Sequence, residues 1–192
     1  GKPYLFIKNF SVENDLKKLA GIKHRFYTED DIIKLFLVLS KEIKKHQSIK
    51  QIFLQGYIIS DFNVKNGISN FSIHFLNSFL ETFGEVNSGI KFMFPLPEKG
   101  SACKRMNLFL RWMVRKDELD FGLWNEIPAS KLVIPVDTHV ARISKKLKLT
   151  KSKIATWKMA EEITQNLKKF DAADPIKYDF AICHIGIRKL KF

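Results

Sequence analysis

Apolar residues recur at helical spacing over most of this chain, and no other feature limits its fold as strongly. Residues 71–83 are the clearest case, because their apolar side chains would share one helix face and Gly84 follows as a helix-ending residue. These side chains belong to Phe71, Phe75, Leu76, Phe79, Leu80 and Phe83. No pair of alternating segments joined by a hairpin turn occurs, so the sequence predicts an all-α fold.

Several other segments show helix start and stop signals. Thr28 followed by three acidic residues is an N-cap with a favourable first turn, and Gly56 ends a short helix that begins at Ser48. Pro175 suits the first position of a last helix that runs to about Arg188. Further helices are expected over residues 15–19, 102–114 and 153–170, and residues 132–134 are a strand or a buried extended segment.

The composition sets outer limits on the architecture. A chain of 192 residues with 45% hydrophobic residues can bury the core of one domain or of two small lobes. No internal repeat or low-complexity linker divides it. No run of about 18 apolar residues occurs, so we expect no membrane span.

Cys103 and Cys183 are the only cysteines, too few for a disulfide framework or for the four thiolates of an iron–sulfur cluster. The five histidines are scattered, and His184 beside Cys183 lacks the spacing of metal ligands. We therefore expect no metal and no cofactor, and a cytoplasmic location.

The charge favours a polyanionic partner, because 33 basic residues face 20 acidic ones and the net charge is +13. A generally Lys-rich composition, with many Phe, Ile and Asn residues, is the alternative explanation. Residues 138–160 argue for the partner, because they hold seven cations and no carboxylate. The cations are Arg142, Lys145, Lys146, Lys148, Lys151, Lys153 and Lys158.

Two short stretches carry the strongest functional signal. In residues 96–107, a tight turn with Pro97 and Gly100 leads into a helix that carries Lys104 about one turn from its start. In residues 134–142, a short apolar run ends at Asp137, which opens another helix. A lysine and an aspartate are thereby presented at two helix starts.

These stretches resemble the helix-hairpin-helix DNA glycosylases of the endonuclease III and 8-oxoguanine glycosylase type, in which a Leu-Pro-x-x-Gly hairpin precedes Lys-x-x-Asn and Val-Asp-Thr-His-x-x-Arg segments. The matching residues here are Leu96, Pro97, Gly100, Lys104, Asn107, Val136, Asp137, Thr138, His139 and Arg142. Glu98 replaces a usual glycine, and two extra residues precede Lys104. The 33 residues from Lys104 to Asp137 resemble the archaeal-type 8-oxoguanine glycosylases, and the second half also resembles an uncharacterised bacterial branch.

The resemblance implies one glycosylase-like unit, residues 1–192, with two helical lobes and an active site in the cleft between them. Residues 29–115 would form a helical barrel that ends in the hairpin. Residues 1–28 and 130–192 would form the second lobe. The implied activity is removal of an oxidised purine, 8-oxoguanine, from DNA, followed by cleavage at the abasic site.

Lys104 and Asp137 are the catalytic candidates that the resemblance implies. A lysine whose pKa is lowered by burial near Arg105 or Arg111 would attack the sugar and form a Schiff base. Lys104 could instead be a phosphate contact or a surface lysine. Asp137 could act only as a helix N-cap, although a capping carboxylate can also stabilise an oxocarbenium-like sugar.

Further residues are candidates for holding the base and the DNA backbone. A flipped base needs flat side chains and polar groups at its edge, for which we consider Phe109, Asp174, Tyr178, Asp179, Gln51 and Gln55. The turn and the basic stretch suggest a backbone-binding set of Lys99, Gly100, Arg105, Arg142, Lys145 and Lys146. Arg142 and His139 would also brace the helix that Asp137 opens.

Two alternative functions remain open. The chain could be a glycosylase that uses water on another lesion, or a non-catalytic DNA- or RNA-binding protein with the same hairpin. The combination of Lys104 with Asp137 argues against a mere binder, because a lone carboxylate beside phosphates weakens binding. The expected partner is double-stranded DNA that contains a damaged base, and the expected state is a monomer.

Overall fold

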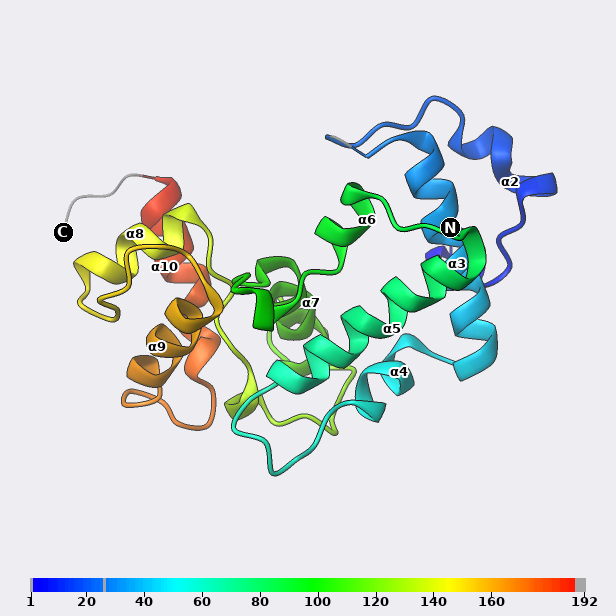
Figure 1. The fold of residues 1–192 in the computed structure, drawn as a ribbon. Helices are drawn as coiled ribbons and strands as arrows, with labels where there is room; N and C mark the ends of the chain where they lie inside the picture. Colours follow the sequence, from blue (N-terminus) through cyan, green and yellow to red (C-terminus); the bar gives the residue numbers. More distant parts are fainter. Residues whose placement is uncertain (1, 26, 189–192) are drawn as a thin grey trace. The chain divides into compact units, whose positions relative to one another are not determined.

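The computed structural model describes residues 2–25 and 27–188 (Figure 1), and within these ranges it contains no β-strand. The all-α prediction is confirmed. The α-helices are α1 (Pro3–Lys8), α2 (Val12–Leu19), α3 (Glu29–His46), α4 (Ile49–Gln55), α5 (Lys65–Phe83), α6 (Ser88–Met93), α7 (Lys104–Val114), α8 (Thr138–Lys146), α9 (Trp157–Leu167) and α10 (Asp179–Ile187). The 3-10 helices are η1 (Pro97–Lys99), η2 (Ala129–Lys131) and η3 (Pro175–Tyr178). No helix of the described part is long and apolar enough to cross a membrane.

The chain divides into two compact units. The first unit consists of Gly1–Gly56 and Asn70–Pro95, and the second consists of Tyr57–Ser69 and Leu96–Phe192. Helix α5 contributes its first five residues to the second unit and the remainder to the first.

The units have other bounds than the lobes expected from the resemblance. The segment before residue 29 belongs with α3 because rings of both pack together: Phe10 lies 5.4 Å and Phe6 lies 6.0 Å from Phe36, measured between ring centroids. Residues 96–115 belong with the carboxyl-terminal helices, because the buried Arg111 of α7 pairs with Asp179 of α10.

In the first unit, α3 and α5 are anchored by local polar signals and by aromatic packing. Helix α3 starts in a capping box, in which the Thr28 hydroxyl accepts a bond from the Asp31 amide and the Asp31 carboxylate accepts one from the Thr28 amide. Phe75 of α5 is fully buried and stacks on Phe94 with a centroid distance of 5.0 Å. Unit 1 therefore has its own aromatic core.

In the second unit, residues 132–136 form a buried extended segment between η2 and α8. Leu132, Val133 and Ile134 are at most 1% exposed, and the Ile134 amide donates to the hydroxyl of Thr164 on α9. The segment is therefore held by a side chain of α9 rather than by a neighbouring strand. Its packing fixes the point at which the chain reaches Asp137.

Some helix bounds differ from those expected. The helix expected over residues 153–170 is shorter, because Thr156 caps the first turn of α9 with a bond from the Met159 amide. The helix expected from residue 102 begins at Lys104, since Cys103 has a left-handed backbone with φ of 46°. Pro175 opens a 3-10 turn before α10 begins at Asp179. The short helices α1 and α6 were not expected.

The core of the second unit should be sensitive at Leu110, which is fully buried on α7. Leu110→Ala should lower the free energy of unfolding by about 2–5 kcal/mol, because it removes buried methyl groups and leaves a cavity. Leu123→Ala is the matched control, since Leu123 is 62% exposed and should change stability by less than about 0.5 kcal/mol. Urea unfolding followed by circular dichroism measures both, and equal losses would contradict the described packing.

Candidate functional site

Lys104 is placed by the turn that precedes α7. The 3-10 turn Pro97–Lys99 ends at Gly100, whose φ of 80° lies in the left-handed region that favours glycine. Glu98, which replaces a glycine of the resembling motif, accepts a hydrogen bond from the Ser69 hydroxyl. Helix α7 then begins at Lys104, so this lysine lies in its first turn.

The amides of the turn are less available than expected. The Lys99 amide donates to the Leu96 carbonyl at 3.1 Å, and the Gly100 amide donates to the Pro97 carbonyl at 2.9 Å. Both amides are therefore already bonded within the turn. The Cys103 side chain does not cap the start of α7.

Asp137 is the N-cap of α8, and its two carboxylate oxygens have different partners. Oδ1 accepts hydrogen bonds from the amides of His139 and Val140, both at 2.9 Å. Oδ2 accepts a hydrogen bond from the Lys104 ammonium, also at 2.9 Å. One oxygen thus caps the helix and the other is presented to the lysine.

The Lys104–Asp137 pair is partly open to solvent. The Lys104 side chain is 48% exposed and that of Asp137 is 20% exposed. The expectation that Lys104 is buried near Arg105 or Arg111 is therefore wrong with respect to burial. Arg111 does line the same cavity as Lys104. Burial alone would raise the pKa of Asp137, but bonds from the Val140 amide and from Lys104 hold it below its ordinary value.

The pair faces a cavity of about 220 Å³ within the second unit. Beside Lys104 and Asp137, its lining consists of Leu108, Arg111, Pro135, Asp179, Phe180, Cys183 and His184. The rings of Phe180 and His184 lie against each other with centroids 4.0 Å apart. The cavity therefore combines a charged pair, a flat aromatic wall and two further buried charges.

Those two charges are Arg111 and Asp179, and they form an ion pair in the wall of the cavity. Arg111 is 7% exposed and donates to Asp179 and to Asp120, which are both 4% exposed. Burial raises the pKa of Asp179 to about 6, although Arg111 opposes this change. Asp179 thus lines the cavity, as its sequence position suggested, but its carboxylate already has a partner.

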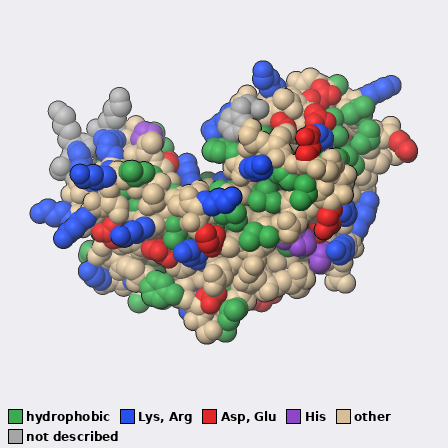
Figure 2. Space-filling view, viewed as in Figure 1, with side chains coloured by type: hydrophobic (Ala, Val, Ile, Leu, Met, Phe, Trp, Pro, Cys, Tyr) green, Lys and Arg blue, Asp and Glu red, His purple; other side chains and the backbone are tan. Residues whose placement is uncertain are grey.

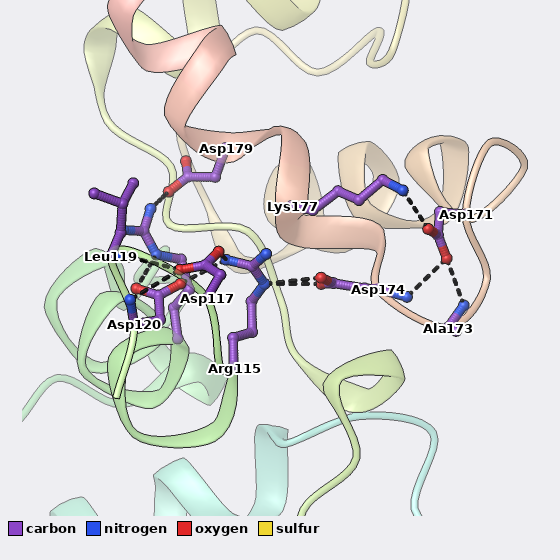
Figure 3. Close-up of polar contacts among 10 residues, drawn as sticks. Arg115, Asp117, Leu119, Asp120, Asp171, Ala173, Asp174, Lys177 and Asp179 are labelled. Carbon is purple, nitrogen blue, oxygen red and sulfur yellow. Dashed lines mark hydrogen bonds and ion pairs between the residues drawn. The ribbon is translucent and has the colours of Figure 1, made fainter. Parts of the chain in front are cut away.

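A second arginine extends this network away from the cavity. Arg115 contacts Asp117, Asp120 and Asp174, and the bonds from its Nε to the two Asp174 oxygens are both 3.0 Å long (Figure 3). The pairs tie the end of α7 to the segment before α10. Asp174 is therefore engaged with Arg115 and does not line the cavity.

The aromatic candidates also lie elsewhere. Phe109 packs edge-on against Trp124, with ring centroids 5.4 Å apart, and is not part of the cavity lining. Tyr178 lines a different and apolar cavity of about 300 Å³ together with Phe170 and other residues of α8–α10 and their loops. Gln51 and Gln55 lie on α4, in the first unit.

The set considered for the DNA backbone lies on the surface. Lys99, Gly100, Arg105, Arg142, Lys145 and Lys146 are all exposed, as are the four further cations of residues 148–158. Figure 2 shows Lys and Arg side chains gathered over the part of the second unit that holds α8. Arg142 also donates to the Gly186 carbonyl at 2.7 Å, which ties α8 to α10.

The contact between α8 and α10 is close and depends on a small residue. A Cβ atom added at Gly186 would lie 2.8 Å from the Cβ of His139, nearer than side chains pack. These two helices lie against each other in Figure 1. Gly186 therefore lets α10 bring its cavity-lining residues near the start of α8.

A family model for a protein of unknown function, DUF2400, matches residues 1–188. The chain belongs to the DUF2400 family. No curated protein and no solved structure matches it. A proposal for the function of this DUF2400 protein must therefore rest mainly on the geometry of the site.

Six cavity residues of this DUF2400 protein were not among the candidate site residues from sequence: Leu108, Arg111, Pro135, Phe180, Cys183 and His184. The signal that could have found four of them is helix phase. Asp179, Phe180, Cys183 and His184 stand at three- and four-residue spacing on α10, so they share one face. Leu108 stands four residues after Lys104 on α7, which places both on the same side of that helix.

Removal of the lysine should change the titration of Asp137. Because Lys104 lowers its pKa, Lys104→Gln should raise that pKa toward the ordinary value, and Lys99→Gln should not. A carboxyl group with a depressed pKa adds stability that is lost as the pH falls from its unfolded-state pKa to its folded-state pKa, so in Lys104→Gln this loss should be smaller and should be complete at a higher pH. Carbon NMR of the Asp137 carboxyl group measures the shift, and an unchanged titration would disprove the pairing.

Proposed function

We propose that this protein is a DNA glycosylase with abasic-site lyase activity, that it has the fold of the helix-hairpin-helix glycosylases, and that its substrate is an oxidised purine, most simply 8-oxoguanine. The observation that carries this proposal is the 2.9 Å contact between the Lys104 ammonium and Asp137 Oδ2 at the mouth of a cavity. These are the two residues that the resemblance assigns to catalysis, and they come from helix starts 33 residues apart.

Lys104 is suited to be the nucleophile. Once deprotonated, its amine attacks the sugar carbon C1′, the bond to the base breaks, and the base leaves with a proton. Opening of the sugar ring gives an imine between Lys104 and C1′. Loss of a proton from C2′ then expels the 3′ phosphate, and water hydrolyses the imine and frees the lysine.

Asp137 is suited to support this reaction by its charge. The low pKa keeps its carboxylate ionised at neutral pH, so that it can stabilise positive charge that develops at the sugar. Its Oδ2 is also the acceptor nearest to the proton that Lys104 must lose. The N-cap bonds to Oδ1 hold the carboxylate in place while it does so.

The cavity suits a single flipped base. At about 220 Å³ it is smaller than the pockets of roughly 300–1,000 Å³ that hold drug-sized ligands. Phe180 and His184 supply a flat wall for stacking, and Asp179 is a polar group that can meet a base edge. The exposed cations of α8 and the following loop suit the phosphates on either side of the lesion.

One observation favours a water-using glycosylase as the second candidate. Lys104 is 48% exposed and its nitrogen donates to Asp137, whereas a lysine that attacks a sugar must first leave such a partner. In that case Asp137 would activate or assist a water molecule, and Lys104 would hold a phosphate. The two candidates differ in whether a covalent complex forms.

Borohydride trapping distinguishes them. We expect that the protein, mixed with duplex DNA that contains 8-oxoguanine or an abasic site and then reduced, forms a covalent complex that Lys104→Gln abolishes. Lys169→Gln is the matched control, because Lys169 is an exposed lysine of the second unit outside the backbone-binding set and should leave trapping intact.

Denaturing gels measure the covalent complex, and peptide mass spectrometry locates the modified lysine. Trapping at another lysine in the Lys104→Gln protein would disprove the nucleophile. Base release without any trapped complex would instead support the water-using candidate, and neither product on a panel of lesions would contradict the glycosylase proposal as a whole.

A further inference from the structure

Three metal-binding side chains come together in the first unit, and none of them belongs to the candidate site of the second unit. Glu42 and His46 stand one turn apart on α3, and His74 lies on α5. One ligand atom from each lies within 4.8 Å of the other two. Among the described residues, this is the group of three side chains that could hold a metal ion. We infer that Glu42, His46 and His74 form a binding site for a zinc ion.

The distances between the ligand atoms suit zinc. Glu42 Oε2 lies 2.7 Å from His74 Nε2 and 3.4 Å from His46 Nε2. Ligands of a tetrahedral zinc ion with bonds of roughly 2.0–2.1 Å lie about 3.3 Å apart. The three atoms lie within 4.8 Å of one another, so side-chain rotations can bring them to coordination distance.

The burial of the group favours a cation between the three side chains. Glu42 is 2% exposed, and His46 Nε2 is a buried nitrogen that makes no hydrogen bond in the described structure. A buried carboxylate requires positive charge or hydrogen bonds, and a buried imidazole nitrogen requires a partner. Glu42 already accepts a bond from Ser78, and a divalent ion at this point would add positive charge beside it and give His46 Nε2 a partner.

The neighbours of the ligands are placed as metal-binding sites require. The Ser78 hydroxyl donates to Glu42 Oε1 at 2.6 Å, which orients the carboxylate and leaves Oε2 toward the histidines. The side-chain amide of Gln55 lies 3.5 Å from Nδ1 of His46. With its carbonyl turned to that nitrogen, Gln55 accepts the proton that a metal-bound imidazole carries there.

The ligand set selects the metal. Two imidazole nitrogens and one carboxylate suit zinc and its neighbours among the transition metals, whereas magnesium and calcium prefer oxygen ligands. His74 also lines a cavity of about 250 Å³ with the polar Gln55 and Asn70, so water can reach the metal as a fourth ligand. The ion would join α3 to α5 and stabilise the first unit.

The experiment measures metal binding by the full-length chain after removal of metal by chelation. We expect one zinc ion per chain, with magnesium unable to compete, and an increase in melting temperature on addition of zinc. Glu42→Gln, His46→Gln and His74→Gln should each lower the zinc affinity by at least about 100-fold, and Ser78→Ala by about 10- to 100-fold.

Two matched controls separate this site from adventitious binding. His24→Gln changes an exposed histidine of the same unit, and His184→Gln changes the histidine beside Cys183, so neither should alter the zinc affinity. Variants that retain zinc at the affinity of the unaltered chain would overturn the site. A chain that binds no zinc, or binds magnesium equally well, would overturn it too.

A second measurement on the unaltered chain decides the matter if the variants fail to fold. Zinc should protect His46 and His74 from modification by diethyl pyrocarbonate, while His24 reacts at the same rate with and without the metal. Peptide mass spectrometry measures the three rates. Equal reactivity of His46 and His74 with and without zinc would show that the cluster is only a set of ion pairs between Glu42 and protonated histidines.

Discussion

The candidate site depends on the carboxylate of Asp137, because its two oxygens do two different things. Oδ1 accepts the amides of His139 and Val140 and thereby fixes the start of α8, while Oδ2 accepts Lys104 from another helix. These cap bonds already hold the Asp137 side chain in one orientation in the folded protein. The lysine therefore meets a charge whose position is already set, as preorganised electrostatic stabilisation requires.

The helical fold could be predicted from the sequence because it rests on local signals, whereas the pairing of Lys104 with Asp137 was implied only by the resemblance. Apolar spacing, N-caps such as Thr28 and Ser48, and the glycine stops determine helices within a few residues of chain. Asp137 is recognisable as a cap for the same reason. The sequence alone does not decide between a strand and a buried extended segment over residues 132–134, because an apolar run does not reveal its hydrogen-bond partner, here Thr164.

The remainder of the site depends on contacts that the sequence does not reveal. The phase of α10 decides that Phe180 and His184 line the cavity, Tyr178 of η3 lines another cavity, and Phe109 packs against Trp124. Asp174 forms an ion pair with Arg115, although its sequence position suggested that it could contact a flipped base. The histidines of the first unit looked scattered in the sequence, because His74 is brought to Glu42 and His46 only when α5 packs on α3.

The most direct test of the account is the single-turnover rate of base release by Asp137→Asn on duplex DNA that contains 8-oxoguanine. Asn keeps an oxygen for the cap and loses the charge, so we expect stability within about 1 kcal/mol of the unaltered protein. Base release should fall by on the order of a hundredfold or more, because the lost charge acts mainly in the transition state. A folded Asp137→Asn protein that releases the base at the unaltered rate would contradict the account and leave Asp137 as a helix cap alone.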